Sequence, residues 1–182
     1  MMPLDKRFFP QFATLTAMVA VTLAVFFTVP AMAGEGKLVA VAEPMLAPEI
    51  MYQGEDGKEH ALSELKGKTV LLHFWATWCV PCREELPKLV AAVAPLENEN
   101  FVMVPISLDR KIEAARAYLD MNKVVMPVWL DPKSAAMRAF ELRGLPSTVL
   151  IDAEGKQVAR GDGVVNWEDT EVIETIKKAS AP

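Results

Sequence analysis

The sequence predicts an α/β sandwich, and three observations lead to that prediction. The run from Thr69 to Trp75, TVLLHFW, is long, apolar and β-branched enough for a strand buried on both faces. A Cys-x-x-Cys pair follows it, and Pro81 between the cysteines suits the first turn of a helix. Strand-like and helix-like segments then alternate to the C-terminus. We therefore expect a sheet with helices packed on it.

Length and composition limit what the chain can be. Its 182 residues are enough for one domain of ordinary size. Hydrophobic residues make up 52% and charged residues 24% of the chain, which is typical of a globular protein with an added apolar segment. The formal charge is −5 and there is no cluster of basic residues, so nucleic-acid binding is not expected.

The first 33 residues have the pattern of a targeting segment. Lys6 and Arg7 precede an apolar stretch from Phe12 to Val29, and Ala31-Met32-Ala33 is a small-residue cleavage pattern. Residues 1–33 are predicted to be a signal peptide, with an uncleaved membrane anchor through residues 12–29 as the alternative. Both place the domain outside the cytoplasm, with the periplasm as the expected compartment. Residues 34–43 are expected to be a flexible leader, and residues 44–182 the folded domain.

The elements expected before the cysteines are short. Met45-Leu46 and Ile50 to Tyr52 are possible edge-strand segments, and a turn at 54–58 predicts a hairpin that returns through 59–62. A helical turn over 63–68 leads into the strand 69–75.

Longer elements follow the cysteines. The apolar spacing of Leu86, Leu89, Val90 and Val93 predicts a helix over 81–93. The remaining expected elements are a strand at 101–107, a helix at 112–121, a strand or extended run at 124–130, a helix at 134–142, a hairpin of 148–152 with 157–160, and a last helix capped by Asn166.

The cysteine pair is the strongest functional signal. Cys79 falls at the start of the expected helix, where unpaired N–H groups and the helix dipole favour a thiolate. Cys82 lies one turn on, close enough to attack a mixed disulfide formed at Cys79. A structural disulfide is the first alternative, but so small a ring stabilises by only about 2 kcal/mol. A zinc site with His60 and His73 is a second, although neither histidine has zinc-finger spacing. Haem attachment is excluded because Arg83, not His, follows Cys82.

The run from Phe74 to Cys82, FWATWCVPC, resembles the active site of the thioredoxin superfamily, and most closely that of the TlpA/ResA-like thiol–disulfide oxidoreductases. The resemblance extends from Pro44 to the C-terminus and includes a second motif, Gly144-Leu145-Pro146-Ser147-Thr148. It implies a thioredoxin-like three-layer sandwich with a central mixed β-sheet. It also implies an N-terminal β-hairpin and a central αβ insertion at about 110–131.

The resemblance also implies roles for single residues. It implies a cis peptide bond before Pro146, which would present the backbone of Leu145 to an extended substrate segment. Trp78, Val80 and Pro81 are the other expected substrate contacts.

Two further side chains have alternative interpretations. Glu85 either relays a proton for Cys82 or is a solvated helix residue. His73 is interpreted as a hydrogen-bonded core residue, with a proton-relay role as the alternative.

On this basis the chain is expected to be an exported protein disulfide reductase that works without a cofactor. The resemblance suggests disulfide-containing extracytoplasmic partners, such as cytochrome c maturation components, and a membrane thiol electron donor. A thioredoxin-fold thiol peroxidase is a weaker alternative, because no Pro-x-x-x-Thr/Ser motif precedes Cys79 at the usual spacing. A non-catalytic metal-binding or chaperone module is the other alternative.

Overall fold

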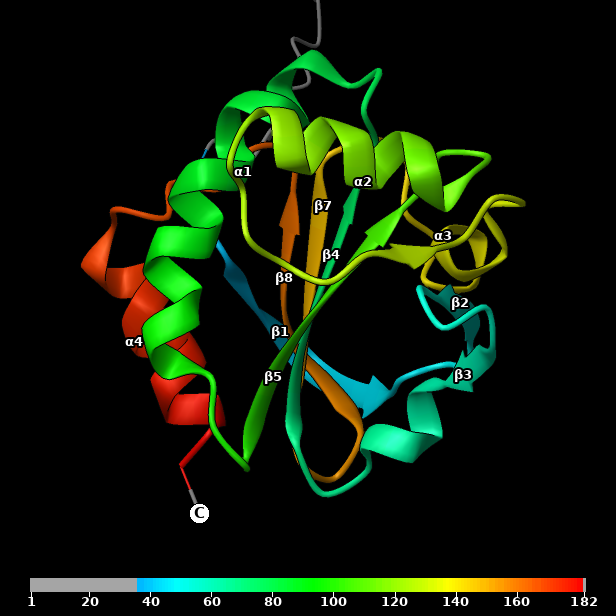
Figure 1. The fold of residues 1–182 in the computed structure, drawn as a ribbon. Coiled ribbons are helices and arrows are strands. Elements are labelled where there is room, and N and C mark those ends of the chain that lie inside the picture. Colours follow the sequence, from blue (N-terminus) through cyan, green and yellow to red (C-terminus); the bar gives the residue numbers. More distant parts are fainter. Residues whose placement is uncertain (1–35, 182) are drawn as a thin grey trace, which may run out of the picture. The chain divides into compact units, whose positions relative to one another are not determined.

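The computed structural model describes residues 36–181, and its sheet is centred on β4 (Thr69–Trp75), in which all seven residues are buried. β4 pairs in parallel with β5 (Phe101–Ser107) on one side and antiparallel with β7 (Ser147–Ile151) on the other. The full order of the mixed, eight-stranded sheet is β1-β8-β7-β4-β5-β6-β2-β3 (Figure 1). Burial on both faces explains why the apolar residues of β4 do not alternate with exposed polar ones; its two polar residues, Thr69 and His73, are buried as well.

The remaining elements are short. The other strands are β1 (Val39–Leu46), β2 (Met51–Gly54), β3 (Glu59–Ala61), β6 (Trp129–Leu130) and β8 (Lys156–Asp162). The α-helices are α1 (Val80–Val93), α2 (Ile112–Met121), α3 (Ala135–Ala139) and α4 (Thr170–Ala179). Two 3₁₀ turns, η1 (Leu62–Leu65) and η2 (Ala94–Leu96), complete the set.

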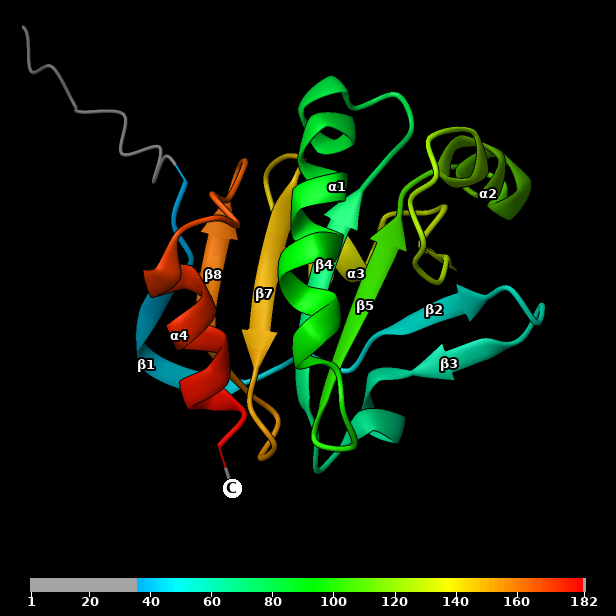
Figure 2. The same cartoon turned by 60° about the vertical axis from the view of Figure 1, so that its left-hand side comes forward.

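Alternate residues of β4 contribute to two separate cores, as the period of a strand requires. Leu71 and Trp75 belong to a core that includes residues of α1, α2 and α4. Val70, Leu72 and Phe74 belong to a second core, with residues of α3 and β2. Figure 2 shows α1 and α4 in front of the sheet and α3 behind it. The predicted three-layer α/β arrangement with a mixed central sheet is therefore confirmed.

Most of the elements expected from the sequence are present. The strands 69–75 and 101–107 and the helix 112–121 have the predicted bounds, and α1 begins one residue earlier than predicted. The two predicted hairpins are β2–β3 and β7–β8, and both pair antiparallel. The helix and strand of the expected insertion are α2 and β6.

The prediction of a flexible leader over residues 34–43 is wrong from Val39 onward. Val39 and Ala40 pair with Arg160 and Ala159 of β8, so β1 forms the edge of the sheet. All but one of the residues of β1 are exposed. An edge strand without a buried face has no alternating hydrophobic pattern by which the sequence could identify it.

Three other predicted elements differ in extent. Only Trp129–Leu130 of the expected run 124–130 is a strand, and α3 is shorter than the expected helix 134–142. The last helix is capped by Asp169, whose carboxylate accepts the Glu171 N–H at 2.9 Å, and not by Asn166. Asn166 instead accepts the Glu168 N–H within the preceding turn.

The predicted signal peptide or anchor, residues 1–33, lies outside the described residues. Within residues 36–181, no helix has both the length and the apolar character needed to cross a membrane.

Candidate active site

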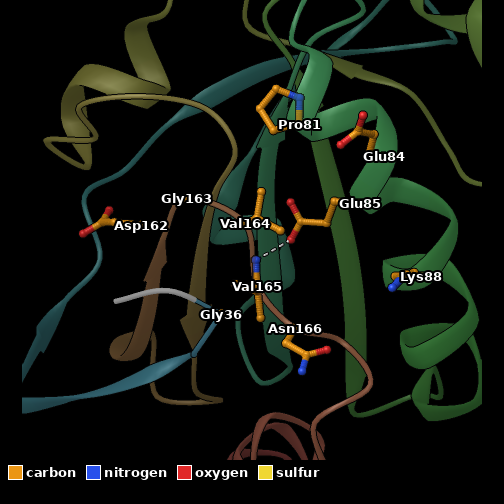
Figure 3. Close-up of a pocket in the computed structure, with 10 residues that line it drawn as sticks. All are labelled: Gly36, Pro81, Glu84, Glu85, Lys88, Asp162, Gly163, Val164, Val165 and Asn166. Carbon is orange, nitrogen blue, oxygen red and sulfur yellow. Dashed lines mark hydrogen bonds between the residues drawn. The ribbon is translucent and has the colours of Figure 1, made fainter. Parts of the chain in front are cut away.

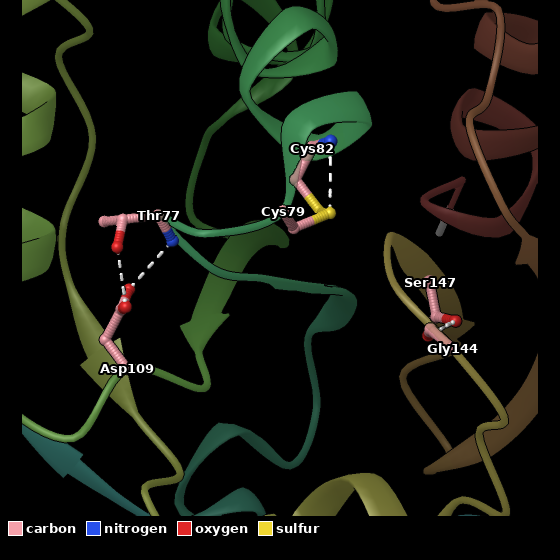
Figure 4. The surroundings of a disulfide bond; sticks show 6 residues. All are labelled: Thr77, Cys79, Cys82, Asp109, Gly144 and Ser147. Carbon is pink, nitrogen blue, oxygen red and sulfur yellow. Dashed lines mark hydrogen bonds between the residues drawn. A yellow bond between two sulfur atoms is a disulfide. The ribbon is translucent and has the colours of Figure 1, made fainter.

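The two cysteines form a disulfide at the N-terminus of α1. Their sulfur atoms are 1.98 Å apart, and Cys79 is the N-cap residue of the helix, with Pro81 in its first turn. The Cys82 N–H donates to Cys79 Sγ at 3.3 Å (Figure 4). Cys79 is 6% exposed, whereas Cys82 is fully buried. Once the disulfide is reduced, the start of the helix stabilises a thiolate at Cys79, and Cys79 is the cysteine of the pair that lines the groove.

The loop before Cys79 is fixed by a buried carboxylate that the sequence analysis did not identify. Asp109 accepts hydrogen bonds from the Thr77 N–H at 3.0 Å and from the Thr77 hydroxyl at 2.7 Å (Figure 4). It also accepts the Ser107 hydroxyl at 2.7 Å. Trp75 and Ser107 pair at the ends of the parallel strands β4 and β5, so Thr77 and Asp109 leave the sheet at the same edge. That pairing of strand ends is the signal that would have identified Asp109.

An open groove lies beside the disulfide. One part of its lining comes from the cysteine loop and the start of α1: Trp78, Cys79, Val80 and Pro81. Of these, Trp78 and Val80 are 66% and 52% exposed. The rest of the lining comes from residues later in the chain: Leu108, Ser134, Met137, Arg143, Gly144 and Leu145.

The second predicted motif contributes to this groove. The peptide bond between Leu145 and Pro146 is cis, as the resemblance implied, and Pro146 is buried. Figure 4 shows Gly144 and Ser147 across from the disulfide, where the Ser147 hydroxyl donates to the Gly144 carbonyl at 2.8 Å. The fold therefore brings together segments that are more than sixty residues apart in the chain.

Glu85 lies on the buried side of the same helix, so the solvated interpretation of this residue is wrong. It is 3% exposed, and its Oε1 accepts the Val165 N–H at 2.9 Å (Figure 3). The same oxygen accepts the Trp167 indole N–H at 2.5 Å. Its Oε2 is buried and has no hydrogen-bond partner among the described residues. Burial raises the pKa of Glu85 to about 7, and the two hydrogen bonds oppose that rise.

The two histidines are engaged away from the sulfur atoms. His73 is fully buried on β4, and its Nδ1 shares a hydrogen bond of 3.1 Å with the Thr148 hydroxyl. Burial lowers the pKa of His73 to about 3, so it is neutral near pH 7 and fits the core interpretation. The ring nitrogens of His60 lie at 3.1 Å from Glu64 and 3.3 Å from Asp56. Residues 36–181 contain no group of three or more His, Cys, Asp or Glu side chains arranged to hold a metal.

The tryptophans have distinct environments. Trp75 is in the core, as predicted, and Trp78 is exposed beside the disulfide. Trp167 is buried, and its indole N–H donates to Glu85. A single sequence gave no indication of that bond, because the two residues are 82 positions apart.

A disulfide between two cysteines at a helix N-terminus, a cis proline near it and a mixed sheet between helices are the features of a thioredoxin-fold thiol–disulfide oxidoreductase. The comparison with known families agrees. Residues 45–159 match the AhpC/TSA family, and the chain belongs to that family.

Named relatives point to the same chemistry. The chain is 30% identical over 119 residues to the thiol-disulfide oxidoreductase ResA of Bacillus subtilis, which covers 65% of this chain and 66% of that protein. It is 29% identical to ResA of Geobacillus kaustophilus over 76% of this chain and 80% of that protein. The predicted likeness to TlpA/ResA-like thiol–disulfide oxidoreductases is confirmed.

Solved structures support the fold. A thiol:disulfide interchange protein of the thioredoxin family from Chlorobium tepidum is similar with a TM-score of 0.63 and 30% identity, over 78% of this chain and all of that one. The thioredoxin domain of a thiol-disulfide oxidoreductase from Bacteroides vulgatus gives a TM-score of 0.65 at 26% identity, again over 78% and 100% of the two chains.

Proposed function

We propose that the protein is an exported reductant of protein disulfides. The observation that carries the proposal is the Cys79–Cys82 pair at the start of α1, with its reachable sulfur in the groove that also contains Leu145. A disulfide of this kind opens and closes without rearrangement of the core, because both cysteines belong to one helical turn.

The proposed reaction transfers two electrons from the dithiol to a partner disulfide. The Cys79 thiolate attacks one partner sulfur, the partner S–S bond breaks, and the other partner sulfur leaves as a thiolate and takes up a proton. The Cys82 thiolate then attacks Cys79 Sγ, which releases the first partner sulfur as a second thiol. The protein is left as the Cys79–Cys82 disulfide, and a dithiol donor must reduce it before the next cycle.

Glu85 is proposed to exchange the proton of Cys82. It follows Cys82 by three residues, so the two side chains lie on one side of α1, one turn apart. A carboxyl group with a pKa of about 7 both accepts and returns a proton near neutral pH. Its unpartnered Oε2 leaves one acceptor available for that proton.

The groove is proposed to bind the partner as an extended segment. The Leu145 N–H and C=O take part in no backbone hydrogen bond within residues 36–181, so both can pair with an added strand. Pro146 would hold Leu145 in place, and the exposed faces of Trp78, Val80 and Pro81 would cover the apolar part of that segment.

Export and the partners belong to the proposal as well. The basic, apolar and small-residue pattern of residues 1–33 supports transfer to the periplasm, with cleavage before Gly34 or retention of an anchor at 12–29. Cytochrome c maturation components are the proposed substrates, and a membrane-embedded dithiol protein is the proposed donor.

The reduction potential of the Cys79–Cys82 pair tests the direction of the reaction. Equilibration in glutathione or dithiothreitol buffers is expected to give a potential of about −270 mV, as for a reducing thioredoxin. A value near about −120 mV, typical of a strong disulfide-forming protein, would overturn the reductive direction. The mass of the protein recovered from a periplasmic fraction tests export, with a chain starting at Gly34 expected.

A further inference from the structure

Among the residues that the structure describes, Arg143 is the one charged side chain that lines the groove beside Cys79. It is exposed, and within residues 36–181 its guanidinium makes no ion pair or hydrogen bond. Arg116 is bonded to Glu55 and Arg160 to Asp162. Arg83 and Arg110 also lack an ion pair within residues 36–181, but neither lines the groove. A cation without a partner in an otherwise uncharged groove leaves its charge available to whatever segment lies there.

Gly144 leaves space next to that cation. A Cβ built on Gly144 would meet no atom within 4 Å, and the backbone of Gly144 is not in the left-handed region. Neither packing nor backbone conformation therefore requires glycine at this position. The missing side chain instead keeps the stretch Arg143-Gly144-Leu145 open on its groove side.

We propose that Arg143 selects partner segments that carry an acidic side chain near the disulfide cysteine, and that Gly144 gives the segment room to approach. The inference rests on the proposed function, because the segment is the one that Cys79 attacks. A segment paired with Leu145 runs past Gly144 to Arg143, since a residue of extended chain spans only about 3.3 Å. An aspartate or glutamate within two residues of the partner cysteine is then close enough to meet the guanidinium.

Paired peptides test this directly. Each peptide holds one cysteine as a neutral 2-pyridyl mixed disulfide, flanked on both sides by glutamates in one peptide and lysines in the other. The Cys79 thiolate of the reduced full-length protein attacks the peptide sulfur, and pyridine-2-thione leaves the peptide. The rate of its release gives the second-order rate constant for attack by Cys79. Dividing by the rate with dithiothreitol removes the effect of the flanking charges on the peptide disulfide itself.

The wild type is expected to react with the acidic peptide about two- to five-fold faster than with the basic one, the range for an exposed ion pair. Arg143→Glu should reverse the order, and the preference should shrink as salt is raised. Lys178→Glu makes the same charge change on α4 and should keep the wild-type preference. Gly144→Val should lower the rate constants for both peptides by the same factor while leaving the free energy of unfolding unchanged.

The outcomes are distinguishable. If the wild type reacts equally with both peptides, or if Arg143→Glu keeps the acidic preference, the assignment to Arg143 is wrong while the exchange function stands. If neither peptide reacts faster with the protein than with dithiothreitol, the proposed function itself fails, and the inference with it.

Discussion

The start of α1 and the segments next to it have two sides with opposite physical character. On the groove side, Trp78 and Val80 are 66% and 52% exposed. On the interior side, Glu85 and Trp167 are 3% and 1% exposed and bonded to each other. The residues proposed to meet a partner can therefore change at little cost in stability, whereas Glu85, proposed to exchange the proton of Cys82, is part of the core. Partner choice and proton chemistry should respond differently to mutation.

Replacement of either cysteine is expected to have the largest effect on disulfide exchange. Cys79→Ser should abolish disulfide exchange because the attacking thiolate is lost. Cys82→Ser should instead halt the reaction at the mixed disulfide between Cys79 and the partner. Non-reducing electrophoresis after incubation with a disulfide-bonded protein distinguishes the two variants. If the mixed disulfide accumulates with Cys79→Ser instead, Cys82 is the attacking cysteine and the proposed assignment is wrong.

Glu85→Gln tests the interior side through stability. With a folded pKa near 7 and an unfolded value near 4.5, the folded state keeps a proton that the unfolded state has released. Stability contributed by Glu85 therefore falls as pH rises from about 4.5 to about 7, by about 3 kcal/mol in total. The variant should match the wild type at pH 4 and exceed it at pH 8 when the oxidised proteins are unfolded in urea.

Because His73 also makes stability depend on pH, the effect of Glu85 must be measured as the difference between Glu85→Gln and the wild type. Its folded pKa of about 3 lies below its unfolded value, so its contribution to stability rises with pH up to about 6.5. The two groups oppose each other between about pH 4.5 and pH 6.5, and only the difference between Glu85→Gln and the wild type isolates Glu85. A difference that does not change with pH would show that Glu85 titrates normally.

Asp109 tests the loop between the two sides. Asp109→Ala leaves the Thr77 N–H and two hydroxyl donors without their acceptor, at a cost of about 1–3 kcal/mol in unfolding free energy. Asp109→Asn keeps an acceptor for the Thr77 N–H and can donate to the Thr77 hydroxyl, so it should retain most of the stability and the exchange rate.

A displaced loop should also alter the approach of partners. Asp109→Ala is expected to raise KM for a protein disulfide while its reaction with dithiothreitol changes little. If Asp109→Asn is as slow as Asp109→Ala, the negative charge of Asp109 matters more than the geometry it imposes on Thr77.

Trp78→Ala should have the smallest effect on stability and tests the groove side. Because Trp78 is 66% exposed, its replacement should change the unfolding free energy by no more than about 0.5 kcal/mol. Reduction of a protein disulfide should slow several-fold, and reaction with dithiothreitol should not. A large loss of stability would place Trp78 among the core residues and end the contrast between the two sides.

Several features could be predicted from the sequence because they depend on residues near one another in the chain. The apolar run of β4, the cysteine spacing and the proline of the first helical turn specify a strand, a loop and a helix N-terminus locally. The hairpins β2–β3 and β7–β8 follow from short turns between strand-like runs. The likeness of two short motifs to a known family then supplied the cis proline and its place beside the cysteines.

The environment of those residues was decided by the tertiary structure alone. Glu85 looks like an ordinary helix glutamate until Val165 and Trp167, about 80 residues away, cover it. The hydrogen bond to Glu85 also holds Trp167 against α1. The last helix, which Asn166 was expected to cap, begins only after Asp169. Thr77 and Asp109 meet because β4 and β5 end at one edge of the sheet. Burial and long-range hydrogen bonds set pKa values and loop positions, and a sequence pattern records neither.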